Sequence, residues 1–360
     1  MTKRVETPAT NGLVARNALG AMGVVGVMAI GLAGSAAGQV PLDPPSGDCA
    51  GHFLNQAVVV GQYTFKAFKN PQTGAACLEV EVQGSHEKKV MGRMAERFIH
   101  KESGEVIFRR TVESFGQFTL GQAARADHDI PKIENGTDLT GRGRPDMIVT
   151  NWTGGAHCCF THYVFELEPK LTLLAEISDA DGYVAYFTRL GGDRAYSYVG
   201  NDWTFAYWDA SFAESPAPAV VLHFVDEGRV VGFHLAMDKM QRPAPSDKAW
   251  KKAVEESQEA FAVHSSSAGG VGSELWSNML DLIYTGHSEL AWKLYDEAWP
   301  AQRADKDKFL AGFCSQLKTS PYWPDLEPTI QNAPQNCAAP AVQQSLVGGS
   351  HGPGYEQPGK

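Results

Sequence analysis

The chain lacks the basic surplus that proteins use to bind a phosphate backbone. Its 360 residues include 31 lysines and arginines against 41 aspartates and glutamates, a formal net charge of −10. No basic run interrupts this excess, and the aromatic residues are spread along the sequence. Because nucleic-acid binding depends on neutralising phosphates, we exclude nucleic acid as a partner.

Several catalytic motifs are also missing. The sequence has no H-E-x-x-H zinc motif, no phosphate-binding P-loop and no G-x-G-x-x-G turn placed after a strand. Histidines and acidic residues are numerous enough to assemble a site in three dimensions, so an enzyme is not excluded. The absence of these motifs favours a non-catalytic protein.

Long hydrophobic runs are scarce beyond the first 38 residues. There, Lys3, Arg4 and Arg16 precede "ALGAMGVVGVMAIGLAGSAAG", an apolar stretch that ends in small residues. This order is typical of a secretory signal peptide. The alternative is an uncleaved anchor, since about 20 apolar residues span a bilayer. The glycines and the polar "QVPLDPPSGD" favour a signal peptide over 1–38, no stable membrane span after cleavage, and a secreted or periplasmic protein.

Cysteine is sparse, and export changes how its six occurrences are interpreted. In an oxidising compartment cysteines form disulfides by default, and six allow fifteen complete pairings. The simplest scheme uses local partners: Cys49 with Cys77, Cys314 with Cys337, and Cys158 with Cys159. Other pairings stay open at this point.

The pattern of residues predicts strands first and helices afterwards. Over 39–240, short runs such as "CLEVEV", "DMIVTNW" and "LTLLAEI" alternate with turn residues, as antiparallel strands do. "VVLHFVDEGRVVGFHL" predicts a hairpin that turns at "DEG". Over 246–325 the apolar residues recur at helical spacing, and the composition of 340–360 predicts a disordered tail.

Four helices are expected in the second region. Ser246 and Ser273 are predicted to cap the first two, and Ser288 to open the third. An apolar stripe predicts the fourth, formed by Phe309, Leu310, Phe313 and Leu317.

The segment "DLTGRGRPDMIV" resembles the aspartate-rich loop and following strand of FG-GAP repeats, the blades of integrin-α-like β-propellers. Asp138 matches the first calcium ligand of that loop, Asp146 the ninth, and Gly143 and the strand "MIV" also fit. The resemblance implies a secreted bacterial protein that is mainly β, with propeller-like antiparallel blades followed by an α-helical C-terminal region. It also implies calcium as a ligand.

Two positions depart from that pattern. Thr140 and Arg142 stand where the family has an acid or an amide. Calcium binds six to eight oxygen ligands, several of them charged, and Arg142 brings a fixed positive charge that can pair with Asp138 or Asp146 instead. A calcium site and a metal-free turn of the same shape are the two alternatives.

The stretch "NWTGGAHCCF" gathers soft metal ligands. His157, Cys158 and Cys159 are consecutive, and His162 follows on the predicted strand. The adjacent cysteines can form a strained vicinal disulfide, pair elsewhere, or remain buried thiols. Zinc or copper would need three or four such ligands, so a transition-metal or redox centre is the remaining alternative.

An aromatic cluster lies in "GNDWTFAYWDASFAESPAPAVVLHF". Trp203, Tyr207 and Trp208 can stack on sugar rings, and Asp202 and Asp209 can supply hydrogen bonds. The alternative is that these aromatic residues belong to the core.

Two functions follow from these observations. The first is an exported, non-catalytic binding protein that presents its loops to a protein or a glycan at the cell envelope. The second is an exported metal-binding or redox protein centred on His157, Cys158 and Cys159.

Overall fold

The computed structural model describes the greater part of the chain after the predicted leader. The described residues are 42, 48–83, 104–113, 115–125, 129–155, 159–180, 182, 184–228, 230–261 and 270–338. The signal peptide predicted over 1–38 and the tail predicted over 340–360 lie outside them.

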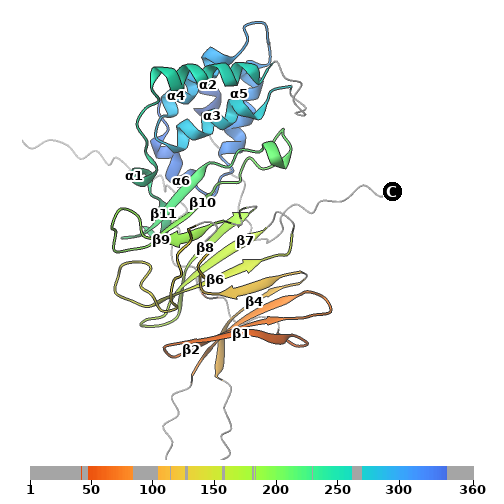
Figure 1. Cartoon of the computed structure of the whole chain (residues 1–360), viewed down its shortest axis with the longest axis vertical. Coiled ribbons are helices and arrows are strands. Elements are labelled where there is room, and N and C mark those ends of the chain that lie inside the picture. Colours follow the sequence, from red (N-terminus) through yellow and green to blue (C-terminus); the bar gives the residue numbers. More distant parts are fainter. Residues whose placement is uncertain are drawn as a thin grey trace, which may run out of the picture. The chain divides into compact units, whose positions relative to one another are not determined.

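The first sheet is an antiparallel meander of four strands (Figure 1). Its strands in order are β1 (Phe53–Val60), β2 (Tyr63–Lys69), β3 (Ala76–Val82) and β4 (Glu105–Val112). Apolar and polar residues alternate along β2, so Tyr63, Phe65 and Ala67 are buried while Thr64 and Lys66 are less so.

The second sheet is built in the same way. Its strands are β5 (Gln117–Leu120), β6 (Asp146–Trp152), β7 (Phe160–Glu166) and β8 (Thr172–Ala180). The "DMIVTNW" run forms β6, and "GGAHCC" falls in the connection between β6 and β7.

The third sheet has the strand order β12-β11-β10-β9. Its strands are β9 (Tyr186–Thr188), β10 (Ser197–Asn201), β11 (Ala219–Glu227) and β12 (Val230–Leu235). Glu227 pairs with Val230, so the hairpin predicted in "VVLHFVDEGRVVGFHL" is confirmed. The protein is therefore mainly β, with three antiparallel sheets of four strands among the described residues.

Helices follow the last strand. They are α1 (Met237–Met240), α2 (Asp247–Glu259), α3 (Ser273–Tyr284), α4 (Ser288–Ala298), α5 (Lys306–Leu317), α6 (Trp323–Leu326) and α7 (Gln335–Ala338). The Ser246 hydroxyl accepts a hydrogen bond from the Ala249 amide and caps α2, as predicted. At α3 the prediction was wrong by one residue, because Gly272 is the N-cap and Ser273 is the first helical residue.

Two hydrophobic clusters hold these elements together. One lies between the first two sheets, where the centroid of the Phe165 ring is 5.6 Å from that of Phe65 and 5.1 Å from that of Phe108. The other runs from the second and third sheets into the helices and includes Tyr198 and Trp276. The helical region is thus part of the same core as the third sheet.

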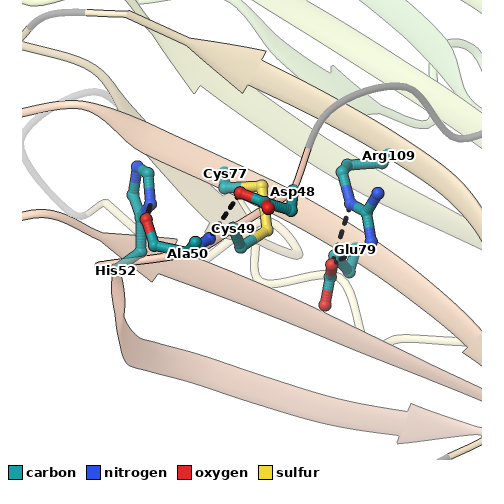
Figure 2. The surroundings of a disulfide bond; sticks show 7 residues. All are labelled: Asp48, Cys49, Ala50, His52, Cys77, Glu79 and Arg109. Atoms are coloured by element: carbon teal, nitrogen blue, oxygen red, sulfur yellow. Dashed lines mark hydrogen bonds and ion pairs between the residues drawn. A yellow bond between two sulfur atoms is a disulfide. The ribbon is translucent and has the colours of Figure 1, made fainter.

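Two disulfides match the predicted local pairing. Cys49 pairs with Cys77 and Cys314 with Cys337, with Cα–Cα distances of 5.7 and 5.2 Å. The first joins the segment before β1 to β3, near the Arg109–Glu79 ion pair (Figure 2). Such bonds restrict the unfolded chain and are typical of proteins in an oxidising compartment. In the described part of the chain, no helix is long and apolar enough to cross a membrane.

Candidate functional site

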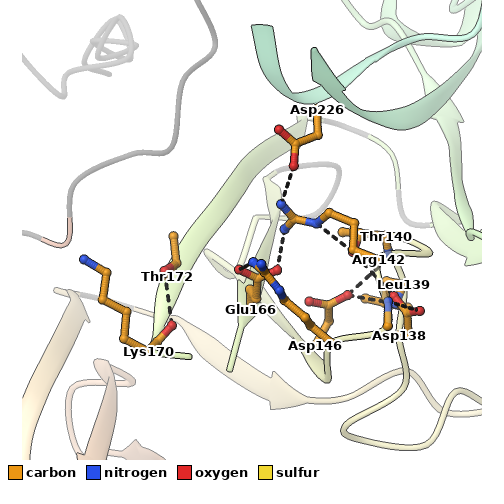
Figure 3. Close-up of polar contacts among 11 residues, drawn as sticks. Asp138, Leu139, Thr140, Arg142, Asp146, Glu166, Lys170, Thr172 and Asp226 are labelled. Carbon is orange, nitrogen blue, oxygen red and sulfur yellow. Dashed lines mark hydrogen bonds and ion pairs between the residues drawn. The ribbon is translucent and has the colours of Figure 1, made fainter. Parts of the chain in front are cut away.

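The loop before β6 is closed by its own aspartates (Figure 3). Asp138 Oδ2 accepts a hydrogen bond of 2.7 Å from the Gly143 amide. Asp146 Oδ2 accepts two, of 2.8 Å from the Leu139 amide and 3.2 Å from the Thr140 amide. Gly143 has a φ of +79°, a backbone conformation in which a residue with a side chain would be strained. Both aspartates thus fix the shape of the turn.

Arg142 links this loop to two strands in the second and third sheets. Its guanidinium pairs with Glu166 on β7, and Nη1 lies 2.8 Å from Asp226 on β11. The same group lies over the Phe224 ring, 4.4 Å from the centroid. Arg144 adds a second ion pair to Glu166, at 3.0 Å. The buried Glu166 carboxylate is therefore held by two arginines.

This arrangement bears on the calcium alternative. The sequence allowed Arg142 to pair with Asp138 or Asp146, but its guanidinium binds Glu166 and Asp226. In the residues that the structure covers, no group of three or more histidine, cysteine or acidic side chains is placed to hold a metal ion. Calcium between Asp138 and Asp146 stays a prediction.

The pKa of the Asp146 carboxyl group is strongly perturbed. Burial raises its pKa from 3.8 to about 7, opposed by the two amide hydrogen bonds and reinforced by the nearby Glu166 and Asp138. Its second oxygen, Oδ1, is buried and has no hydrogen-bond partner among the described residues. At neutral pH this carboxyl group is therefore close to its titration midpoint.

The loop between β10 and β11 carries a surface stack of aromatic rings. The Trp203 and Phe212 rings are stacked, with centroids 5.4 Å apart and an interplanar angle of 12°. The Tyr207 ring lies 5.5 Å from Phe212 at 35°. Tyr207 is 50% exposed, and its φ of +58° is unusual for a bulky residue. The backbone thus holds this ring at the surface in an uncommon conformation.

Local hydrogen bonds fix that conformation. The Ser215 hydroxyl accepts from the Tyr207 amide at 2.9 Å and donates to the Ser211 carbonyl at 2.9 Å. Glu214 Oε2 accepts from the Ser211 hydroxyl at 2.7 Å. Asp209 also has a positive φ, of +50°. The two left-handed residues and these bonds make a defined loop.

Trp208 anchors the same loop to the helices. Its ring makes edge contacts with Trp276 at 5.2 Å, Phe309 at 5.7 Å and Phe205 at 5.2 Å. The alternative that these aromatic residues belong to the core therefore holds for Trp208, whereas Tyr207 is exposed.

Asp202 is buried at the start of the loop and is engaged internally. Its Oδ2 accepts hydrogen bonds from the Tyr284 hydroxyl and, at 2.6 Å, from the Ser320 hydroxyl. Its Oδ1 accepts from the Thr204 amide at 2.8 Å and from the Thr204 hydroxyl. Burial and the Asp202 charge raise the pKa of Tyr284. Asp202 therefore joins the third sheet to the helical region.

The connection between β6 and β7, which contains the adjacent cysteines, is described only in part. His157 and Cys158 lie outside the described residues, and Cys159 is disulfide-bonded. His162 is inside the core, where its ring lies 5.5 Å from the Tyr198 ring and Nδ1 is 3.0 Å from the Thr150 hydroxyl. Burial lowers the pKa of His162 to about 4, so it is neutral at physiological pH.

Comparison with protein-family models, with curated proteins and with solved structures gave no match to this chain. The fold defines a mainly β protein with a helical C-terminal region. Phe212, in the ring stack, belongs to the aromatic segment that was quoted from the sequence. The two acidic partners of Arg142, Glu166 and Asp226, were not predicted, because neither carries a local sequence signal.

Proposed function

We propose that the protein is an exported, non-catalytic binding module that presents the aromatic loop between β10 and β11 to a glycan or a protein at the cell envelope. The observation that carries this proposal is the exposed Tyr207 ring, held at a φ of +58° against the stack of Phe212 and Trp203. Residues in sparsely populated backbone conformations are concentrated at binding and catalytic sites.

The chemistry of the loop favours a ligand whose contacting surface is uncharged. Aromatic faces bind the apolar faces of sugar rings and of side chains. A loop already fixed by hydrogen bonds loses little conformational entropy on binding. Between Arg194 and Arg229 the sequence has no lysine or arginine, while Asp209 and Glu214 lie in the loop itself. Anionic polymers are therefore disfavoured.

The scaffold in this proposal consists of FG-GAP-like blades. Each described sheet has four antiparallel strands, the size of a propeller blade. The loop with the "DLTGRGRPD" sequence precedes β6, as the resemblance implies. The disulfides and the leader sequence support export.

Replacing Tyr207 by alanine is expected to weaken binding of the purified protein to isolated cell envelopes of its own organism about tenfold or more, a loss of about 1.4 kcal/mol. A sedimentation assay measures this. Phe115→Ala is the matched control, because Phe115 is 70% exposed with a φ of +51° and lies outside the loop.

The two classes of ligand separate in the same assay. Periodate oxidation of the envelopes abolishes binding to a glycan, and protease treatment abolishes binding to a protein. Equal loss of binding in Tyr207→Ala and Phe115→Ala, or no loss in either, contradicts the assignment of this loop.

A second candidate function is that of an exported metal-binding or redox protein centred on His157, Cys158 and Cys159. One observation favours it. Cys159 is disulfide-bonded, while Cys49, Cys77, Cys314 and Cys337 pair among themselves. This supports the vicinal disulfide predicted from "HCC", and a vicinal disulfide is more easily reduced than an ordinary one.

Mass spectrometry of the denatured protein tests this second function. If Cys158 and Cys159 form a vicinal disulfide, a mild reductant is expected to reduce it before the other disulfides, which adds two hydrogens to the mass. Peptide mapping then locates both new thiols in the segment that contains Cys159. Retention of a zinc or copper ion in the native mass would support a metal centre. Simultaneous reduction of all disulfides would rule out a redox centre at this segment, and the absence of a bound metal would rule out a metal centre.

A further inference from the structure

An unpaired sheet edge invites pairing with another strand, and most edges among the described residues are protected against it. β5 has four residues and β9 has three, which makes these edges short. β8 carries Glu176 and Asp179. At β12, Asp325 of α6 accepts hydrogen bonds from the Leu235 amide at 3.0 Å and bonds His234 at 2.9 Å.

The two edges of the first sheet differ sharply. β4 carries Glu105, Arg109 and Arg110 within eight residues. β1, at the opposite edge, has the sequence FLNQAVVV, with eight residues, no charge and no proline. Among the described residues, β1 therefore lacks the usual protection of an edge strand.

Exposed apolar side chains are concentrated on β1. Of the six large hydrophobic residues exposed in the described part of the chain, three belong to this strand: Phe53 at 69%, Leu54 at 56% and Val59 at 61%. An irregularity between Leu54 and Gln56 shifts the register. As a result Leu54, Ala57 and Val59 face Phe68, Lys66 and Thr64, which lie on the less buried face of β2.

The strand itself is firmly held from the other side. Gln56 Oε1 accepts a 2.8 Å hydrogen bond from the Leu120 amide of β5. Val58 and Val60 pack against the core between the first two sheets. β1 is thus firmly placed, and no described residue forms a strand pair with its outer edge.

We propose that β1 pairs with β1 of a second copy of the chain, in antiparallel orientation about a two-fold axis near Ala57. The chain has a net charge of −10, which opposes self-association over most of its surface. β1 carries no charge, so this pairing places no like charges opposite each other.

The symmetry also explains why the assembly closes at two copies. A two-fold contact uses the same patch on both chains, so both free edges are consumed and none remains for a third copy. The two first sheets then form one continuous sheet, and Leu54 of one copy lies near Val59 of the other. The pairing satisfies the outer backbone groups of both strands and brings their exposed apolar side chains into contact.

Light scattering coupled to size-exclusion chromatography tests the proposal on the purified, full-length secreted protein. The wild type is expected at twice the monomer mass, and Ala57→Lys/Val59→Lys at the monomer mass, because lysines on both strands repel. Thr111→Lys adds a lysine at an exposed position of β4 and is expected to leave the dimer intact.

Amide hydrogen exchange of the wild type gives a readout that does not depend on a variant. Protection of β1 is expected to rise with protein concentration, while protection of β4 stays constant. A wild type that is monomeric at every concentration overturns the proposal. So does a dimer that the β1 lysines leave intact, or a monomer whose β1 is covered by a peptide from another protein.

Discussion

The wild-type protein is expected to lose stability as the pH rises from about 4 to about 7, and replacing Asp146 by asparagine is expected to abolish this pH dependence. In the folded protein, burial raises the pKa of this carboxyl from 3.8 to about 7. The folded state therefore keeps the proton over a pH range in which the unfolded state has released it. Stability from this group is complete below pH 3.8 and is lost as the pH approaches 7.

The size of the effect follows from the shift in pKa. A change from 3.8 to about 7 corresponds to roughly 4 kcal/mol, at 1.36 kcal/mol for each unit. The substituted amide side chain stays neutral at every pH, and its oxygen can still accept from the amides of Leu139 and Thr140. Urea denaturation at several pH values is expected to give equal free energies of unfolding at low pH and a more stable variant above pH 7.

A control substitution isolates this group from the other titrating residues. Asp238→Asn removes an exposed carboxylate near the start of α1 and is expected to leave the pH profile parallel to that of the wild type. If Asp146→Asn also gives a parallel profile, the carboxyl is not held in the neutral form.

The second large effect is expected at Asp202. Asp202→Ala removes the acceptor for the hydroxyls of Tyr284, Ser320 and Thr204, which lie in or beside the core. Each buried donor left without an acceptor costs about 1–3 kcal/mol. We expect the free energy of unfolding to fall by about 4 kcal/mol, measured by urea denaturation.

A double-mutant cycle distinguishes this network from a simple packing defect. Tyr284→Phe alone removes one donor, and Asp202→Ala with Tyr284→Phe is expected to cost less than the two single changes added together. Glu227→Ala, at an exposed position of β11, is the matched control and is expected to change stability by less than about 0.5 kcal/mol. Strict additivity in the cycle would show that the two side chains do not interact.

Local sequence patterns were sufficient for most of the secondary structure. The hairpin of β11 and β12 follows from alternation around "DEG", and the start of α2 follows from Ser246 as a cap. Such features depend on residues within a few positions of each other. The Cys49–Cys77 and Cys314–Cys337 disulfides could also be predicted, because they close short segments of the chain.

For the candidate sites, the sequence indicates which residues could take part but not how their side chains are oriented or what they contact. Trp203 and Tyr207 stand out in the sequence as candidate ligand contacts, but nothing local shows that Trp208, the next residue after Tyr207, packs against Trp276 in the core. Asp202 is bonded to Ser320, 118 residues further along. Arg142 is bonded to Asp226, 84 residues away. These contacts depend on how sheets and helices pack, which residue spacing does not encode.

Hydroxyl-radical footprinting of the protein with and without isolated cell envelopes shows directly whether the aromatic loop between β10 and β11 is the binding surface. Binding through the aromatic loop predicts protection of Trp203, Tyr207 and Phe212, while Phe115 and the segment containing Cys159 stay as reactive as in the free protein. Protection of the Cys159 segment with an unchanged aromatic loop would contradict this assignment and would place the binding site in the connection between β6 and β7.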